Sequence, residues 1–213
     1  MTELLIVGAG GFGREVLTYA QDMELKVSGF LDENAGALQN FGLPVGVIGT
    51  LSEHRFAEGE RVIVAVGDPL VRRKLARQVV AQGGQLFTLI HPTAYVARNA
   101  LVEAGCIICP FAMVGAHSHV GWNTAINTYA SVGHDARIGA HTVFSPYSVV
   151  NGHVTLGEAV FLGTHASVTP GKTVGLNSKI SAGSVVSRTV EVGSLVSGNP
   201  AKGRVMFATQ LDE

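Results

Sequence analysis

The chain has 213 residues and a formal net charge of −1, so it is long enough for one compact domain or two small ones. It contains no run of basic residues, which argues against nucleic acid or an anionic membrane surface as its main partner. No apolar stretch reaches the ~18 residues of a membrane-spanning helix, and no signal-peptide pattern opens the chain. We therefore expect a cytoplasmic protein without a membrane partner.

Residues 1–90 alternate short apolar runs with helical patterns. The first run, Leu4–Val7, predicts a buried strand, and the apolar face of Arg14–Met23 predicts a helix after it. The next elements predicted are a strand over Lys26–Leu31, a loop containing Gly and Pro, a strand over Arg61–Val66, a helix over Pro69–Gln82 and a strand over Leu86–Ile90. This alternation is typical of an α/β unit with a parallel sheet.

A glycine-rich segment, Gly8–Gly13, joins the first predicted strand to the first helix. A G-x-G-x-x-G in this place presents backbone N–H groups at the positive end of a helix, where phosphate binds. Asp32 ends the second strand about twenty residues later, where a carboxylate accepts hydrogen bonds from ribose hydroxyls. Alternatively, the glycines only form a tight turn between the strand and the helix and bind no ligand. We expect a nucleotide site but no dehydrogenase, because residues 1–90 hold only half of a dinucleotide-binding unit.

The rest of the chain repeats every six residues. An aliphatic residue or Phe stands without a break at Val96, Val102, Ile108, Val114, Val120, Ile126, Val132, Ile138, Phe144, Val150, Leu156, Leu162, Val168, Val174, Ile180, Val186 and Val192. A period of six is neither helical nor a simple alternation, so it predicts a solenoid of short strands joined by tight corners. Gly often follows the aliphatic residue, and we expect it to supply the backbone freedom that each bend needs.

Cys106 and Cys109 form a C-x-x-C within this repeat. Both fall on the small and corner positions of the six-residue pattern. A zinc or redox site would need further partners that the sequence does not provide, so we interpret both cysteines as packing residues.

These features together resemble the hexapeptide-repeat acetyltransferases that modify nucleotide-linked amino sugars in bacterial glycan synthesis, whose relatives include the sialic acid O-acetyltransferases. The segments that carry the resemblance are GAGGFG, FLDE, AVGD, NTYASVGHD and GNPAK. The resemblance implies a Rossmann-like nucleotide-sugar-binding domain over residues 1–90. It also implies a left-handed parallel β-helix acyltransferase domain over residues 91–213 with a short C-terminal tail. Such a helix has three hexapeptides per turn, so residues eighteen apart stack.

The resemblance also implies which residues bind the nucleotide. The diphosphate would meet Gly11, Phe12 and Gly13, the base or ribose would meet Asp32 and Glu33, and Gly67 would flank the nucleotide. Members of the family commonly have His where this chain has Phe12, so one phosphate contact of the family is missing here.

The same resemblance places the catalytic pair at His134 and Asp135. A histidine held by a carboxylate suits general-base chemistry, because the acid fixes its tautomer and raises its basicity. His134 would take a proton from the sugar amine, with direct acetyl transfer. Eighteen-residue stacking puts His117, Asp135 and His153 in one column and leaves small neighbours around His134. A solvent-exposed corner histidine beside an incidental acid is the alternative.

The implied acetyl donor is acetyl-CoA, and no metal is expected. The co-substrate would lie in a groove between two subunits of a homotrimer, near Val143, Gly152, Gly163, Thr164 and Thr173, with Lys172 and Lys202 close to its phosphates. Val143 stands where relatives carry a second histidine near the acetyl carbonyl. A backbone N–H such as that of Gly152 would then stabilise the oxyanion.

Three other functions stay open. The first is O-acetylation of a sialic acid, and the second is a non-catalytic nucleotide-sugar-binding protein. The third is a zinc enzyme of the carbonic anhydrase type using His117 and His153. The position expected for its third ligand holds Glu158, and Asp135 lies between the two histidines.

Overall fold

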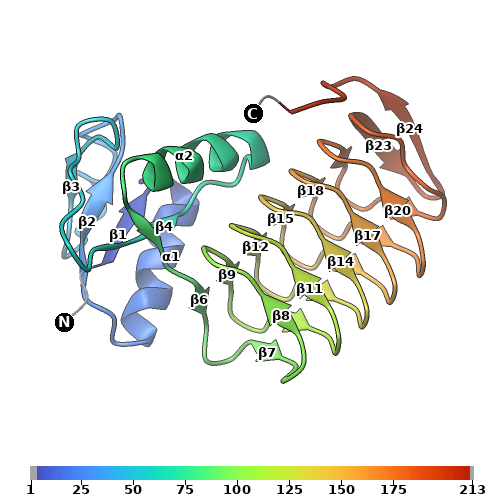
Figure 1. Ribbon diagram of the computed structural model, residues 1–213, viewed down its shortest axis with the longest axis horizontal. Helices are drawn as coiled ribbons and strands as arrows, with labels where there is room; N and C mark the ends of the chain where they lie inside the picture. Colours follow the sequence, from blue (N-terminus) through green and yellow to red (C-terminus); the bar gives the residue numbers. More distant parts are fainter. Residues whose placement is uncertain (1–3, 212–213) are drawn as a thin grey trace.

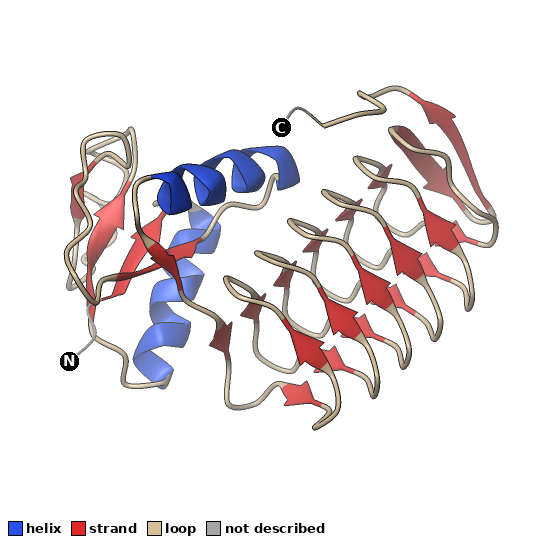
Figure 2. Cartoon of the chain, viewed as in Figure 1, coloured by secondary structure: helices blue, strands red, loops and turns tan. Residues whose placement is uncertain are grey.

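The computed structural model describes residues 4–211 and consists of an N-terminal α/β lobe beside a long three-sided coil (Figures 1 and 2). The lobe is built on a parallel sheet with the strand order β3-β2-β1-β4-β5. Its strands are β1 (Leu4–Val7), β2 (Val27–Leu31), β3 (Val47–Gly49), β4 (Arg61–Val64) and β5 (Gln85–Leu86). Its helices are α1 (Gly11–Asp22) and α2 (Pro69–Ala81). Among residues 4–211, neither helix has the length and the continuous apolar surface that a membrane span requires.

The lobe follows the predicted order of elements with three differences. α1 begins at Gly11, so the last glycines of the Gly8–Gly13 segment form its first turn. The predicted loop after β2 contains β3, a short edge strand that pairs with β2. The predicted strand over 86–90 is two strands in two sheets, because β5 pairs with β4 whereas β6 (Leu89–Ile90) pairs with the coil.

The coil has three faces, each a stack of parallel two-residue strands. The first face holds β7 (Tyr95–Val96), β10 (Met113–Val114), β13 (Ser131–Val132), β16 (Val149–Val150), β19 (Ser167–Val168) and β22 (Val185–Val186). The second face holds β8 (Leu101–Val102), β11 (His119–Val120), β14 (Arg137–Ile138), β17 (Thr155–Leu156) and β20 (Thr173–Val174). The third face holds β6, β9 (Ile107–Ile108), β12 (Ala125–Ile126), β15 (Val143–Phe144), β18 (Phe161–Leu162) and β21 (Lys179–Ile180). It ends in the antiparallel hairpin of β23 (Ser194–Gly198) and β24 (Ala201–Val205).

Strands pair in register every eighteen residues, as predicted. Met113 lies opposite Ser131, and Val114 lies opposite Val132. The repeated aliphatic residue is the second residue of each strand and points into the coil, where side chains such as Phe144 are fully buried. Full burial of one such side chain contributes about 1.5–3 kcal/mol to the free energy of unfolding. Each rung buries few such side chains, so the coil is stable only when many rungs stack on one another.

Cys106 and Cys109 are free, fully buried thiols in this stack. Burial raises the pKa of Cys106 to about 11 and raises that of Cys109 further, so both thiols stay protonated. The two residues fill space, in agreement with the interpretation from the repeat.

Most glycines of the repeat serve close packing, so the expectation that they make the bends is wrong for all of them except Gly193, whose φ is 67°. A Cβ on Gly133 would lie 2.5 Å from the backbone of Asn151 on the next rung. The bend comes two residues later, at residues with positive φ such as Asp135 (59°) and His153 (59°). Asp, Asn and His are the residues other than Gly that adopt this conformation most readily.

The third face of the coil is covered by the lobe. Val16 and Ala20 of α1 belong to the same apolar cluster as Ile107, Ala125 and Val143 of that face. Figure 1 shows both helices between the small sheet and the rungs of the coil. The first and second faces are therefore the ones that remain open.

Arg72 fixes α2 to the coil. Its guanidinium is fully buried and donates from Nε to the carbonyl oxygen of Asn123 at 2.6 Å. It also donates to the carbonyl oxygens of Gly105 (3.3 Å) and Val64, which lie in the coil and in β4. Three carbonyl oxygens thus accept the hydrogen bonds that the guanidinium would otherwise make to water.

Candidate active site

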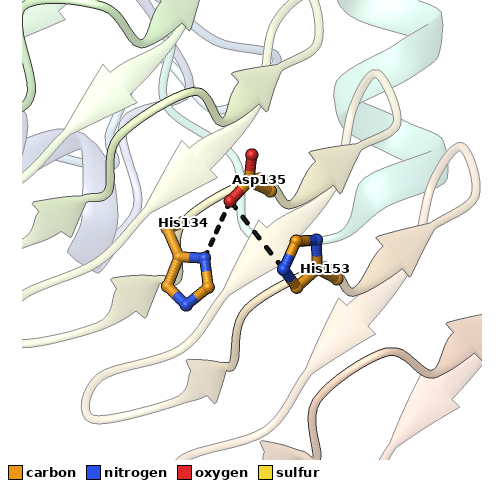
Figure 3. A group of neighbouring side chains, drawn as sticks. All are labelled: His134, Asp135 and His153. Carbon is orange, nitrogen blue, oxygen red and sulfur yellow. Dashed lines mark hydrogen bonds and ion pairs between the residues drawn. The ribbon is translucent and has the colours of Figure 1, made fainter.

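His134 stands at the corner that joins β13 on the first face to β14 on the second. Its Nδ1 lies 2.8 Å from Oδ2 of Asp135 (Figure 3). Because a carboxylate only accepts, Nδ1–H donates this bond and Nε2 keeps its lone pair. The imidazole is 62 % exposed, so this free nitrogen is accessible to a substrate.

Asp135 lies between two imidazoles. Its Oδ2 is 3.9 Å from Nε2 of His153 on the next rung, and the rings of His134 and His153 meet edge to face with centroids 5.1 Å apart. The hydrogen bond from His134 is the main cause that holds the pKa of Asp135 below its ordinary value, and the charges of His153 and His117 act in the same direction. Asp135 is therefore an anion that orients and stabilises a protonated imidazole.

The column predicted from eighteen-residue stacking is present. His117, Asp135 and His153 share a positive φ of 57°, 59° and 59°. His117, however, bonds to Asn99 on the rung below, with 3.0 Å between its Nε2 and the amide nitrogen. His117 therefore belongs to the column, but its ring does not contact Asp135 as those of His134 and His153 do.

A cavity of about 440 Å³ opens beside His134. Its wall includes both histidines and small residues such as Ala116 and Gly152. A Cβ on Gly152 would lie 2.5 Å from Cε1 and 2.6 Å from Nε2 of His134, so the imidazole occupies the space that any larger residue would need. The predicted small neighbours of His134 therefore determine where its ring lies.

The sequence did not single out several residues of this cavity. Tyr95 and Met113 contribute to it from the open first face and are 64 % and 42 % exposed, and Pro170 contributes from the corner two rungs above His134. A sequence feature that could have identified Tyr95 and Met113 is a large apolar residue at the first position of a two-residue strand, whose side chain points away from the core. The sequence could not say which of the three faces stays open.

The glycine-rich segment and Asp32 form one unit. Asp32 accepts from the N–H of Ala9 at 2.7 Å and from the N–H of Asn34 at 2.9 Å. Gly11 is exposed at the first turn of α1, and a Cβ on Gly67 would meet nothing within 4 Å, so the backbone at both glycines is open to a ligand.

Two residues that we expected to bind the nucleotide, Phe12 and Gly13, have packing roles that could not be predicted from the sequence. A Cβ on Gly13 would lie 2.0 Å from the carbonyl oxygen of Gly8, so this glycine lets α1 pack against the turn. The Phe12 side chain is half-buried against the apolar cluster under α1. Glu33 is exposed.

The residues predicted to bind the acetyl donor lie on different faces of the coil and do not form one site within a single subunit. Val143 is 5 % exposed under the lobe, and this burial leaves its side chain no access to a ligand. Gly163 is buried against Ala182, and Thr164 is exposed at the corner between the third and first faces. Thr173 is exposed on the second face. Gly152 alone belongs to the cavity of His134.

Two further histidine environments bear on the chemistry. His141 is 2 % exposed, and burial, with the charges of Arg72, Arg73 and Arg77, lowers its pKa to about 3. A buried, neutral histidine of this kind has no access to a substrate amine. In residues 4–211, His134, Asp135 and His153 form the group able to hold a metal ion, with ligand atoms within 4.8 Å of one another, and it includes the proposed base itself.

An α/β lobe with a phosphate-type turn, joined to a parallel β-helix with an exposed His–Asp pair, defines a hexapeptide-repeat acyltransferase. The PglD N-terminal domain family matches residues 3–79. A histidine-to-asparagine variant of perosamine N-acetyltransferase from Caulobacter crescentus, solved with CoA and GDP-perosamine, is 33 % identical, covers 95 % of this chain and 96 % of its own, and superposes with a TM-score of 0.89. The acetyltransferase domain of PglB from Neisseria gonorrhoeae is 32 % identical, with coverages of 95 % and 99 % and a TM-score of 0.88.

Among curated proteins, GDP-perosamine N-acetyltransferase of Escherichia coli O157:H7 is 27 % identical over 135 residues, which are 59 % of each chain. This alignment spans little more than half the length of that relative. The two solved structures cover nearly the whole chain, so this protein belongs to the family of hexapeptide-repeat sugar N-acetyltransferases, and its coil is a left-handed parallel β-helix as predicted.

Proposed function

We propose that this protein transfers an acetyl group from acetyl-CoA to the amine of a nucleotide-linked amino sugar. The observation that carries the proposal is the His134–Asp135 pair, with Nδ1 bonded to the carboxylate and Nε2 free at a cavity. The open backbone at Gly11 and Gly67 suits the phosphates and flank of a nucleotide. The perosamine N-acetyltransferase from Caulobacter crescentus was solved with CoA and GDP-perosamine, and the curated relative from Escherichia coli is a GDP-perosamine N-acetyltransferase.

In the proposed reaction, Nε2 of His134 takes a proton from the sugar amine as the nitrogen attacks the acetyl carbonyl. The new C–N bond forms, the C–S bond breaks, and the thiolate leaves with coenzyme A. Asp135 holds the imidazole in the tautomer that exposes Nε2 and stabilises the imidazolium.

The N–H of Gly152 is the proposed donor to the oxyanion. It has no hydrogen-bond acceptor within residues 4–211, and Gly152 lies against the His134 ring. An unpaired backbone donor beside the base is the kind of group that stabilises charge developing on a carbonyl oxygen. Val143 is buried under the lobe and does not line the cavity at His134, so its side chain takes no part in this step.

The proposal includes a homotrimer. The first face exposes Tyr95 and Met113, which form one wall of the cavity at His134. Apolar residues in such a position are typical of surfaces that another subunit covers. The proposal also keeps the cytoplasmic location expected from the sequence. Size-exclusion chromatography with light scattering measures the oligomeric state directly.

The decisive experiment is an acetylation assay with acetyl-CoA that follows release of the free thiol. The acceptors are nucleotide-linked amino-deoxy sugars with different bases, and free and nucleotide-linked sialic acids serve as comparison. Turnover with an amino sugar supports the proposal and names the nucleotide. Turnover with a sialic acid alone establishes the O-acetyltransferase instead, and turnover with neither class of acceptor contradicts the proposal.

A further inference from the structure

His134 and His153 each direct a ring nitrogen at the carboxylate of Asp135 (Figure 3). Oδ2 of Asp135 lies 2.8 Å from Nδ1 of His134 and 3.9 Å from Nε2 of His153. One ligand atom from each of the three residues lies within 4.8 Å of the other two. Two ligand atoms on a tetrahedral zinc ion, with bonds of about 2.1 Å, are about 3.4 Å apart, so the two distances to Asp135 lie on either side of this value.

The stacked corners fix the backbone behind these three side chains. The N–H of His153 donates to the carbonyl oxygen of His134 at 3.0 Å, and the N–H of Asp135 donates to that of Ala116 at 2.9 Å. The side chains themselves are 62 %, 42 % and 66 % exposed at His134, Asp135 and His153. Small rotations of exposed side chains bring the three ligand atoms around one ion without repacking the core. The open side leaves a fourth position for water.

The donor set selects the class of cation. Two imidazole nitrogens and one carboxylate oxygen suit zinc and the neighbouring transition metals, whereas Mg²⁺ and Ca²⁺ prefer ligand sets made of oxygen. Other histidine–carboxylate pairs in residues 4–211, such as His119–Glu103, bring only two ligands together. The corner at His134 is therefore the place where the described part of the chain binds a zinc ion most tightly.

We propose that Zn²⁺ binds to His134, Asp135 and His153 and inhibits the enzyme reversibly. The binding site stands on the geometry alone, whereas the inhibition rests on the proposed function. A neutral imidazole has one nitrogen lone pair in the ring plane, and in His134 it is at Nε2. When Zn²⁺ bonds to Nδ1, the proton of Nδ1 moves through solvent to Nε2, so the ring stays neutral. Nε2 is then an N–H donor and cannot take a proton from the sugar amine. Zinc is thus an inhibitor at this site and not a cofactor.

Calorimetry with zinc chloride on the full chain, without an affinity tag, measures the binding directly. The wild type should bind one Zn²⁺ per chain, and an excess of Mg²⁺ should not compete. His153→Gln removes one ligand and keeps the His134–Asp135 pair, so the zinc affinity should fall at least tenfold. His117→Gln is the matched control, because His117 lies in the same column but bonds to Asn99, and it should keep the wild-type affinity.

The acetylation assay tests the inhibition. Loss of the thioester is followed, because the released thiol would itself bind zinc, and each variant is compared with its own rate in EDTA. The wild type should lose activity over the range of zinc concentrations in which calorimetry detects binding, and EDTA should restore it. His153→Gln should need at least tenfold more zinc for the same inhibition.

The outcomes separate the site, the inhibition and the proposed function. The site is wrong if the wild type binds no zinc, or if His153→Gln and His117→Gln bind it with equal affinity. Zinc that binds through His153 but leaves the turnover of the wild type unchanged disproves the inhibition. A protein that binds zinc through His153 but acetylates no amino sugar keeps this site and loses the proposed function.

Discussion

At the residue scale, the reactivity of His134 depends on which ring nitrogen carries its proton. The 2.8 Å bond to Asp135 places that proton on Nδ1 and leaves Nε2 as the base. His134→Ala removes this base, so kcat should fall about 10²- to 10⁴-fold. Stopped-time thiol-release assays give kcat, and circular dichroism verifies that the variant is folded. Turnover close to that of the wild type would disprove the assignment.

Asp135→Asn tests the second member of the pair. An amide is nearly isosteric with the carboxylate but offers no charge to a protonated imidazole, so kcat should fall less than in His134→Ala. The acid limb of the pH–rate profile should move to lower pH, because protonated His134 loses its anionic partner. A profile identical to that of the wild type would mean that Asp135 has only a structural role.

Gly152 determines the position of the His134 ring. A methyl group at this position would overlap the imidazole, with contacts of 2.5–2.6 Å, so Gly152→Ala should displace the ring and lower kcat at least tenfold. Gly46→Ala is the matched control, since a Cβ there meets nothing within 4 Å. Equal kcat values for the two variants would show that the ring has room to move without loss.

At the scale of single elements, the corner at His141 couples pH to stability. His141 is buried and accepts from Asn123 at Nδ1 (2.9 Å), which requires the neutral ring. Burial, followed by the charges of three arginines, lowers its folded-state pKa from 6.5 to about 3. The unfolded chain therefore binds the proton first, so stability is complete above pH 6.5 and decreases as the pH falls toward 3.

Urea midpoints at pH 7 and pH 4.5 measure this coupling. The wild type should lose stability between the two values, and His141→Gln should lose less because it has no proton to take up on unfolding. His165→Gln, at an exposed corner, is the control and should keep the pH dependence of the wild type. A pH dependence equally large in His141→Gln would assign the effect to other groups.

The elements also show what sequence reasoning can reach. The six-residue period predicted the rungs from Val96 to Val186, because burial of one side chain per strand leaves a strict pattern. The prediction was wrong at the two ends, where β6 already belongs to the coil and where Val190 rather than Val192 packs against the core. The pattern did not reveal why the glycines are needed. The clash of a Cβ on Gly133 with the next rung and the positive φ of Asp135 are properties of stacked backbones. β3 was missed because three residues at a sheet edge leave little pattern.

At the scale of the whole molecule, the sequence could not tell which face of the coil the lobe covers. Val143 and Ser131 occupy equivalent outward positions in the repeat, yet Val143 is buried under α1 and Ser131 lines the cavity at His134. The pairing His134–Asp135 was predictable because both residues are neighbours in one corner. Positions such as Pro170 reach the cavity at His134 only through the stacking of rungs.

The two parts of the molecule should unfold as one unit because of Arg72. Arg72→Met leaves three buried carbonyl groups without their donor, so it should destabilise the lobe by about 3 kcal/mol. Urea unfolding followed by far-ultraviolet circular dichroism reports mainly α1 and α2, and amide hydrogen exchange at core positions far from the lobe, such as Val168, reports the coil. Fluorescence of Trp122, the one tryptophan, is unsuitable for this purpose because its ring packs against the apolar cluster of the lobe.

In the wild type the two signals should change together. In Arg72→Met the helical signal should shift to lower urea by ~1–2 M and separate from the exchange signal of the coil. Arg77→Met, which removes an exposed cation from the same helix, should leave the transitions coincident. Coincident transitions in Arg72→Met would mean that the apolar contact of α1 with the third face is sufficient to join the lobe to the coil.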